Sequence, residues 1–381
     1  MGRDNNLKVI DLFSGSGGSA LGFRKAGFSI NVAVDIDKPA SESFKLNFPE
    51  AFVFTSDIST LSGKQLLRAG SIRNGKEVLL IACPPCQGFS SARRISQRTN
   101  DLRNKLINEF LRIVEEIKPR AFVLENVPGL ATGIGKPLYL QILDKLHELG
   151  YRTVDGVVNA ADYGVPQRRR RLILLGTNDP NIELSFPPQT NENSSETSIL
   201  PAWKTVREAL IDLPPLKAGE KNIKNAMHKS ASLSEINLKR IKQTPHDGGD
   251  RTSWTEDLVL ECHKTTNGHK DVYGRMKWDA PSPTITGGCA MISKGRFGHP
   301  EQDRAISLRE AARLQTFPDT FIFAGNFGEI AKQIGNAVPP LLAQRAAEAI
   351  RNAIEHPKKV EKTTSHGRHD HSAFQDTSLT A

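Results

Sequence analysis

The stretch LKVIDLFSGSGGSA, residues 7–20, joins a short apolar run to a glycine-rich turn. Gly15, Gly17 and Ala20 match the spacing G-x-G-x-x-A, in which glycine allows a tight bend and a close approach of the backbone to a ligand. The next apolar run ends at Asp35, about twenty residues later, where a carboxylate can accept hydrogen bonds from ribose hydroxyls. The turn and the acid predict a pocket for an adenosine-bearing cofactor, but they do not distinguish a dinucleotide from S-adenosylmethionine.

Strand-like and helix-like runs alternate over the first 180 residues, which is the pattern of a doubly wound α/β fold with a parallel sheet. Apolar residues recur at helical spacing over residues 105–117, and Lys118-Pro119 predicts the end of that helix. The strands are expected at residues 7–13, 30–34, 51–54, 78–82, 121–125, 153–158 and 171–175, and further helices at 140–149, 307–315 and 339–354.

The character of the sequence changes after Thr177. Residues 178–196 are rich in Asn, Pro, Ser and Thr, which is typical of a connection, and regular periodicity is poor from there to about residue 300. We expect a catalytic domain over residues 1–180, completed by about 326–355, and a smaller irregular domain over 181–325. The polar tail, residues 356–381, is expected to be disordered. Its histidines could bind a metal, but a solvated tail is the favoured interpretation, and no metal site is predicted.

The bulk composition is that of a soluble, basic protein. Charged residues make up 24% of the 381, and the formal net charge of +9 favours a polyanionic partner. No apolar run approaches the roughly 20 residues that cross a bilayer, and the polar N-terminus shows no signal peptide. Four cysteines without a secretion signal indicate a reducing compartment. We therefore expect a cytoplasmic protein with no membrane partner.

A cysteine follows the apolar run at residues 78–81. Cys86 stands in the sequence Cys83-Pro84-Pro85-Cys86-Gln87, where two prolines stiffen a turn at the edge at which open α/β sheets bind ligands. About forty residues later the run 121–124 ends in Glu125, so a thiol and a carboxyl should meet in one crevice. A nucleophilic thiol is favoured over a redox pair, which would normally open a helix in a domain of about a hundred residues. It is also favoured over half of a zinc site, because no second C-x-x-C follows.

Further motifs follow in the order found in C5-cytosine DNA methyltransferases, and the chain resembles the bacterial type of that family. The motifs are Pro84-Pro85-Cys86-Gln87, Glu125-Asn126-Val127, Gln167-Arg168-Arg169-Arg170-Arg171, residues 304–318 and Gly335-Asn336-Ala337-Val338-Pro339-Pro340. The resemblance covers most of residues 7–350, apart from the variable middle region. It implies a Rossmann-like sheet that binds S-adenosylmethionine, and a smaller target-recognition domain that reads the bases of double-stranded DNA.

The resemblance also implies a covalent mechanism on a cytosine that is flipped out of the duplex. Cys86 would attack C6, and C5 would then take the methyl group. Glu125 would hydrogen-bond N3 and the exocyclic amine, and a carboxyl desolvated in a closed pocket could hold its proton near pH 7. Arg171 would support the site near Cys86, and Arg169 would contact the cytosine O2.

The residues that the resemblance assigns to the cofactor come from both ends of the chain. Aromatic and apolar side chains would contact the adenine, acids would bind the ribose and the adenine amine, and the glycine-rich turn would lie near the methionine part. These residues are Phe13, Gly15, Gly17, Gly18, Asp35, Ile36, Asp57, Pro84, Asn336 and Val338.

Basic segments outside the motifs predict where DNA is held. Residues 90–100 are polar and basic and include Arg93 and Arg94. We expect a mobile lid that closes on the DNA backbone, and we favour it over an ordinary solvated loop. Five basic residues of the middle region are candidates for contact with DNA phosphates. For each of them a position on the solvated surface, without a DNA contact, is equally favoured. These are Arg251, Lys264, Lys270, Arg275 and Lys277.

Three rival functions remain. A tRNA cytosine-C5 methyltransferase would share the motifs, but residues 284–291 lack the Cys-Phe-Thr run associated with that branch. A nicotinamide-dependent oxidoreductase would leave Cys86 and Glu125 unexplained, and a catalytically silent DNA-binding protein would not need them. We expect a monomeric bacterial DNA methyltransferase of the cytoplasm, near the nucleoid. It would serve restriction-modification, paired with an endonuclease, or epigenetic marking.

Overall fold

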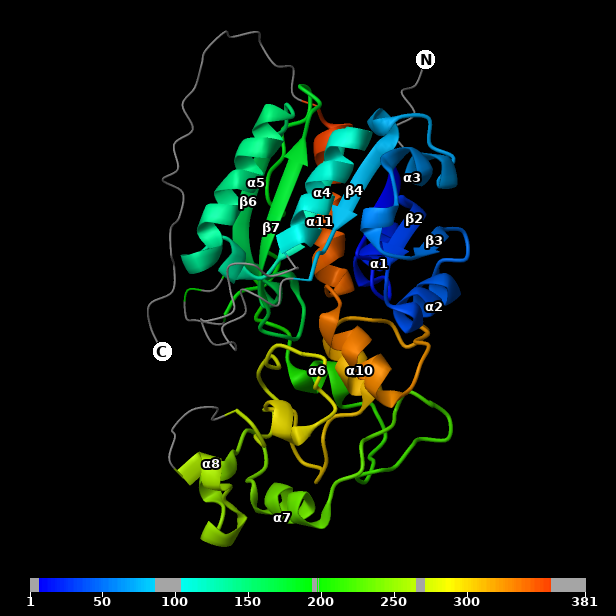
Figure 1. Ribbon diagram of the computed structural model, residues 1–381. Helices are drawn as coiled ribbons and strands as arrows, with labels where there is room; N and C mark the ends of the chain where they lie inside the picture. The colour runs from blue at the N-terminus through cyan, green and yellow to red at the C-terminus, as the bar shows by residue number, and fades with distance from the viewer. Residues whose placement is uncertain (1–6, 86–103, 194–196, 198, 265–270, 358–381) are drawn as a thin grey trace.

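The computed structural model describes residues 7–85, 104–193, 197, 199–264 and 271–357 (Figure 1). Within these residues a seven-stranded sheet has the order β3-β2-β1-β4-β5-β7-β6. The strands are β1 (Lys8–Leu12), β2 (Ser29–Asp35), β3 (Phe52–Thr55), β4 (Val78–Ala82), β5 (Ala121–Asn126), β6 (Arg152–Asn159) and β7 (Arg170–Thr177). The expected α/β sheet of Rossmann-like type is confirmed, and every predicted strand is present.

One strand departs from the prediction of a parallel sheet. β1 to β5 pair in parallel, whereas β7 lies antiparallel to both β5 and β6. The prediction was wrong at β7 because no crossover helix joins it to β6. Only a short stretch that includes a 3₁₀ turn (Ala160–Tyr163) lies between the two strands. A short connection favours antiparallel neighbours, since parallel neighbours need a longer crossover.

Helices cover both faces of the sheet. Because side chains alternate along a strand, Val9 and Leu79 enter one hydrophobic core while Ile10 and Leu80 enter another. The first core contains residues of α1 (Gly18–Lys25), α2 (Lys38–Asn47) and α11 (Pro340–Glu355). The second contains residues of α3 (Gly63–Ala69), α4 (Asn104–Ile117) and α5 (Lys136–Glu148).

The last helix of the chain returns to the first. A Cβ on Gly22 of α1 would lie 2.4 Å from the carbonyl oxygen of Pro340 and 2.6 Å from Cβ of Ala343, so only glycine permits this close packing of α1 and α11. The preceding helix, α10 (Phe327–Asn336), was not predicted. It begins with a capping box formed by Asn326 and Glu329 and buries Ile330 and Ile334.

The described part of residues 181–325 forms few regular elements. The helices here are α6 (Val206–Leu210), α7 (Glu235–Gln243), α8 (Glu261–Lys264) and α9 (Leu308–Leu314), and α7 and α8 lie far from the sheet (Figure 1). A small core around Ile241, Trp254 and Tyr273 supports α7. No helix of the described residues is both long and apolar enough to span a membrane.

Both interpretations of Arg275 are wrong. Its side chain is fully buried, pairs with Asp303 and donates hydrogen bonds to the carbonyl groups of Ile241, Thr244 and His299, so it neither faces solvent nor reaches a phosphate. Lys264 pairs with Glu261 at 2.7 Å, Lys277 is exposed, and Lys270 lies outside the described residues. Arg251 is half-buried.

Candidate active site

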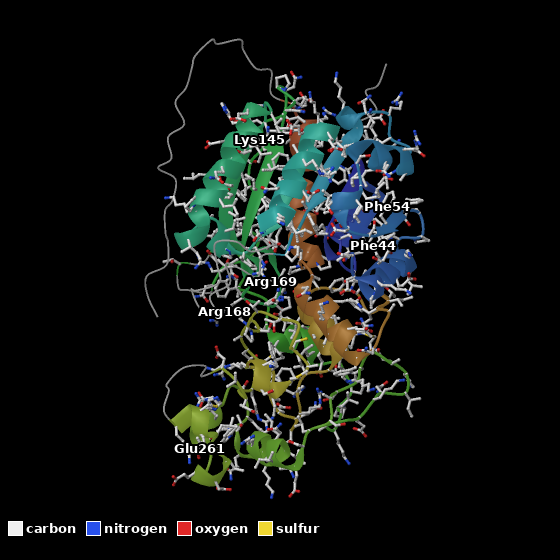
Figure 2. All side chains as sticks on the ribbon, viewed as in Figure 1. Phe44, Phe54, Lys145, Arg168, Arg169 and Glu261 are labelled. Carbon is white, nitrogen blue, oxygen red and sulfur yellow. The ribbon has the colours of Figure 1, made fainter. Side chains whose placement is uncertain are left out.

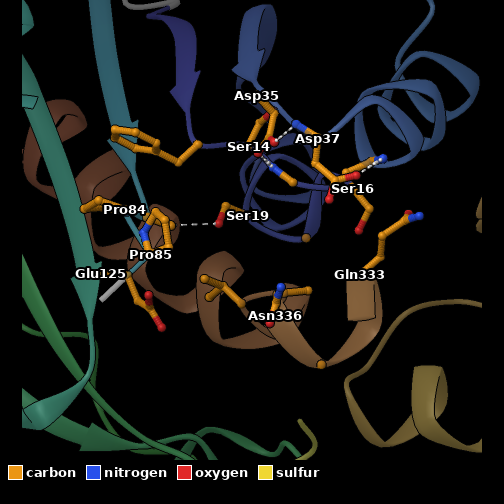
Figure 3. A pocket seen from close by; sticks show the side chains of 18 of the residues that line it. Ser14, Ser16, Ser19, Asp35, Asp37, Pro84, Pro85, Glu125, Gln333 and Asn336 are labelled. Atoms are coloured by element: carbon orange, nitrogen blue, oxygen red, sulfur yellow. Dashed lines mark hydrogen bonds between the residues drawn. The ribbon is translucent and has the colours of Figure 1, made fainter. Parts of the chain in front are cut away.

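A cavity of about 710 Å³ lies at the carboxyl ends of β1, β2, β4 and β5. Its walls come from the glycine-rich turn, from the residues that follow those strands, and from residues 284–287 and 332–338. Figure 3 shows Asp35, Pro84, Glu125 and Asn336 around it. This edge of the sheet is where open α/β proteins bind ligands, and segments far apart in the sequence meet here.

Most of the site residues predicted from the sequence line this cavity. Those that do are Phe13, Gly15, Gly18, Asp35, Ile36, Asp57, Pro84, Glu125, Arg169, Arg171, Asn336 and Val338. Gly17 instead lies behind the turn, as the N-cap of α1 with φ of 98°, and a Cβ there would lie 2.6 Å from the ring of Phe48. Cys86 and the expected lid at residues 90–100, with Arg93 and Arg94, lie outside the described residues.

Asp35 organises the glycine-rich turn. Its Oδ2 accepts a hydrogen bond of 2.7 Å from the backbone N–H of Gly15, and its Oδ1 accepts one of 2.8 Å from Asp37 N–H. Burial raises the pKa of Asp35, while these two donors oppose that shift. Since each carboxylate oxygen can accept a second hydrogen bond, Asp35 can still bind ribose hydroxyls.

Two further residues suit an adenine ring. The Ile36 side chain is 70% exposed although it lines the cavity, so it offers an uncovered apolar surface for the face of a ring. Asp57 accepts hydrogen bonds at Oδ1 from Ser59 N–H and from Ser59 Oγ, and these lower the pKa of its carboxyl. Its Oδ2 therefore remains open to an amine.

Lys332 was not singled out from the sequence, yet it lies at the cavity wall. Its Nζ donates a hydrogen bond of 2.7 Å to Oδ2 of Asp37, and both residues line the cavity. Burial by itself would raise the pKa of the Asp37 carboxyl. The hydrogen bond from Lys332 outweighs this effect and holds that pKa below its ordinary value. Oδ1 of Asp37 caps α2 by accepting from Ala40 N–H. The pair thus connects α2 with α10.

Glu125 and Arg171 form an ion pair in the cavity. Nε of Arg171 on β7 lies 2.9 Å from Oε1 of Glu125 on β5, and both side chains are largely buried. The ion pair lacks the geometry of a hydrogen bond, so Oε1 has no hydrogen-bond partner among the described residues. Nη1 of Arg171 donates to the carbonyl group of Arg170. A charged pair is therefore held where a polar ligand could contact it.

Arg169 has a different environment. Its Nη1 donates to the carbonyl oxygens of Ile285, at 3.0 Å, and Gly335, at 3.3 Å, while its Nε has no hydrogen-bond partner among the described residues. Burial, and next the neighbouring Arg171, lowers the pKa of Arg169 to about 9. Arg169 thus joins the start of β7 to residue 285 and to the end of α10.

Two acidic groups near the glycine-rich turn have raised pKa values: Cys83, which is half-buried and lines the cavity, and Asp11, which is fully buried. The thiol of Cys83 is 3.4 Å from Ser19 Oγ, and burial, reinforced by Glu125 and Asp11, raises its pKa well above the ordinary value. Because the thiolate is the reactive form, Cys83 is poorly suited to be a nucleophile. The carboxyl of Asp11 is fully buried, and its pKa is also raised well above the ordinary value, by burial and then by Asp35.

The acids of the cavity decide which class of cofactor fits. Asp35, Asp37 and Asp57 line the part of the cavity next to the glycine-rich turn. Lys332, which contacts Asp37, is the nearest positive charge that balances them. Such an environment favours a ligand that carries positive charge over the doubly negative pyrophosphate of a dinucleotide. Among the described residues, no group of three His, Cys, Asp or Glu side chains could hold a metal ion.

Comparisons with known proteins agree with this geometry. Residues 7–352 match the family model of the C-5 cytosine-specific DNA methylases. The chain is 38% identical over 353 residues to the Type II methylase M.HgiDII of Herpetosiphon aurantiacus, covering 91% of this chain and 96% of that relative. It is 38% identical over 349 residues to the Type II methyltransferase M1.HphI of Haemophilus parahaemolyticus, covering 91% and 87%.

A solved structure is similar as well. It is a prophage-encoded chain of E. coli described as a DNA modification methyltransferase, with a TM-score of 0.67 and 27% identity, and the match covers 92% of this chain and 100% of that one. The family model, both relatives and this structure each span nearly the whole described chain. The chain therefore belongs to the C-5 cytosine-specific DNA methylase family.

Proposed function

We propose that this DNA (cytosine-5-)-methyltransferase transfers a methyl group from S-adenosylmethionine to C5 of a cytosine flipped out of double-stranded DNA. The observation that carries the proposal is that one cavity is lined both by the acids Asp35 and Asp57 and by the Glu125–Arg171 pair. A methyl donor and an acceptor base held in one cavity can react without diffusing apart.

Cys86 is the proposed nucleophile. Cytosine C5 is a poor nucleophile, and addition of a thiolate at C6 makes the ring enamine-like, after which C5 can attack the methyl group. S-adenosylhomocysteine is left behind, and passage of the C5 proton to a water molecule with elimination of the thiolate then restores the enzyme. Cys86 follows Pro85, which lines the cavity. Its role rests on the sequence motif, because Cys86 itself lies outside the described residues.

Glu125 and Arg171 would hold the base. The carboxylate of Glu125 lines the cavity, and it can accept a hydrogen bond from the exocyclic amine of cytosine. Arg171 touches Glu125, whereas the Nη1 of Arg169 is already bound to two carbonyl groups. We therefore place Arg171 beside the base and Arg169 behind it as a positioning residue. This differs from the division of roles expected from the sequence.

The cofactor would bind along the glycine-rich turn. S-adenosylmethionine supplies an electrophilic methyl group on a sulfonium ion, and its positive charge suits a wall that carries three aspartates. Asp35 would bind the ribose and Asp57 the adenine amine, with Ile36 and Phe13 against the ring. Asn336, Val338 and Pro84 complete the wall.

The proposed division of labour follows the expected domains. Residues 1–180, completed by 326–355, would carry the chemistry, and the packing of α11 against α1 supports that assignment. Residues 181–325 would read the bases of duplex DNA. We propose a cytoplasmic bacterial enzyme that acts as a monomer. The Type II names of two relatives favour a role in a restriction-modification system, beside an endonuclease.

A labelling experiment tests the activity. With methyl-labelled S-adenosylmethionine, duplex DNA should become labelled and tRNA should not. Sequencing of the modified cytosines would then give the recognition sequence. DNA that carries 5-fluorocytosine at the target should become covalently attached to the wild-type protein but not to the Cys86→Ala variant. Methyl transfer by Cys86→Ala, or labelling of tRNA alone, would contradict the proposal.

A further inference from the structure

The arginine run after Gln167 has two faces. Arg169 is buried and Arg171 is nearly so. Arg168, which precedes Arg169, and Arg170, which lies between the two, are exposed. The alternation follows from extended backbone, in which successive side chains point to opposite sides. Figure 2 shows Arg168 and Arg169 at the level where the sheet meets the lower part of the molecule. The sequence motif assigns roles to the inner arginines and none to the outer two.

The backbone of this run is fixed on both sides. Arg168 N–H donates to the carbonyl group of Ser282 at 2.8 Å, and Thr284 Oγ1 donates to the carbonyl group of Arg168 at 2.7 Å. Arg170 begins β7 and pairs with Asn159 of β6. Because this backbone is held by other segments, the two exposed side chains start from fixed positions beside the cavity that Arg169, Arg171 and Thr284 line.

The two outer guanidinium groups have no acidic partner among the described residues. Among the described residues, most arginines that reach the surface pair with a carboxylate, as Arg207 does with Asp279 and Arg313 with Asp212. The Arg168 guanidinium instead lies 5.9 Å from the centre of the Trp203 ring. The Trp203 indole N–H donates to Asp162 at 2.9 Å, which fixes the ring that Arg168 faces.

Resting on the proposed function, we infer that Arg168 and Arg170 bind the backbone phosphates of the DNA strand that carries the target cytosine. A flipped base remains attached to its sugar, so the phosphates next to it must lie against the rim of the cavity that receives the base. Arg168 and Arg170 are two residues apart in an extended backbone, so their Cα atoms are separated by about 6.7 Å along the strand. Guanidinium groups bind phosphate oxygens through paired hydrogen bonds.

The test is the salt dependence of DNA binding by the full-length protein. Each phosphate contact contributes about 0.9 to the slope of log K against log salt, so R168Q/R170Q should lower that slope by about 1.8. At moderate salt its KM for duplex DNA should rise about tenfold, with kcat and the affinity for S-adenosylmethionine unchanged. R168K/R170K should keep the wild-type slope because both charges remain.

The matched control is K64Q/R68Q, which removes two exposed charges from α3 in the half of the molecule away from α7 and α8 (Figure 1). Its slope should equal that of the wild type. An unchanged slope in R168Q/R170Q, or an equal fall in K64Q/R68Q, would overturn the inference. The proposed function fails separately, if the wild type itself transfers no methyl group to duplex DNA. A loss of slope on tRNA alone would also reject DNA as the partner of these residues.

Discussion

Lys332 on α10 and Asp37 at the start of α2 are 295 positions apart in the sequence, yet their side chains share a hydrogen bond of 2.7 Å at the wall of the cavity. Both side chains remain partly exposed, at 59% and 31%, so the pair lies near solvent rather than deep inside. The stem of Lys332 also lies against Gly287, whose added Cβ would be 3.4 Å from the Cα of Lys332. The N-terminal half and two later segments therefore meet at this lysine.

We predict that this ion pair helps to retain the cofactor. K332M and D37N should each weaken binding of S-adenosylmethionine by about two- to fivefold, the range expected for a partly exposed ion pair. D37N is the suitable acid variant because asparagine still caps α2. The double variant should bind no worse than either single one, as measured by calorimetric titration. K45M, which breaks the ion pair with Glu42 on α2, is the control and should bind normally. Fully additive effects would show that the two residues act independently.

The Glu125–Arg171 pair gives a second prediction. Glu125→Gln keeps the size of the side chain but cannot carry negative charge or a carboxyl proton, so kcat should fall about 100-fold or more. Arg171→Lys should lose less than Arg171→Met, because lysine still neutralises Glu125. Single-turnover methylation measures both effects. Binding of S-adenosylmethionine should be unchanged in all three variants, and a parallel loss of that binding would indicate a structural role instead.

The sheet could be predicted almost completely because each strand is a short apolar run bounded by turn residues. The direction of β7 could not, since the order of apolar runs does not show which pairs lack a crossover helix. α10 was missed although the sequence carries two signals of it, the capping box of Asn326 and Glu329 and the helical spacing of Ile330 and Ile334. Arg275 was misinterpreted because a buried arginine that bonds carbonyl groups looks the same in sequence as an exposed one.

The cavity shows a similar limit. The ends of two apolar runs predicted Asp35 and Glu125 in one site, the family resemblance added Asn336, and all three line the cavity. Lys332 could not be found in this way, since nothing in the sequence signals its contact with Asp37. Arg169 and Arg171, two residues apart, both point inward, so sequence spacing cannot decide which one reaches Glu125. The register of β7 against β5 decides it, because Glu125 lies opposite Ile173, next to Arg171 on the same face.

Cys83 should be chemically quiet near neutral pH. Its raised pKa means that the thiol stays protonated until the pH rises well above the ordinary range of cysteine, so alkylation should increase only in strong base. After brief exposure to iodoacetamide at pH 8, mass spectrometry should find label on exposed Cys262 and little on Cys83. Cys83→Ser should keep methyl transfer within about threefold, since serine is close in size and the thiol takes no part in the proposed chemistry. Rapid labelling of Cys83 at pH 8 would show that it is more accessible or more acidic than its surroundings imply.

Asp11 should make the folded protein less stable as the pH rises. Both oxygens of its buried carboxyl lack a hydrogen-bond partner among the described residues, and its pKa in the folded state lies well above the value of about 3.9 in an unfolded chain. The folded state therefore binds this proton more tightly. The resulting stability is fully present below the pKa of the unfolded state and is lost as the pH rises through the pKa of the folded state.

Asp11→Asn removes the charge while keeping the shape. In urea unfolding, the free energy of unfolding of this variant should exceed that of the wild type at pH 8, with little or no gain at pH 5. Asp144→Asn, at an exposed position of α5, should follow the wild type at both values. Equal destabilisation of Asp11→Asn at pH 5 and pH 8 would mean that an ionised Asp11 holds the glycine-rich turn in place.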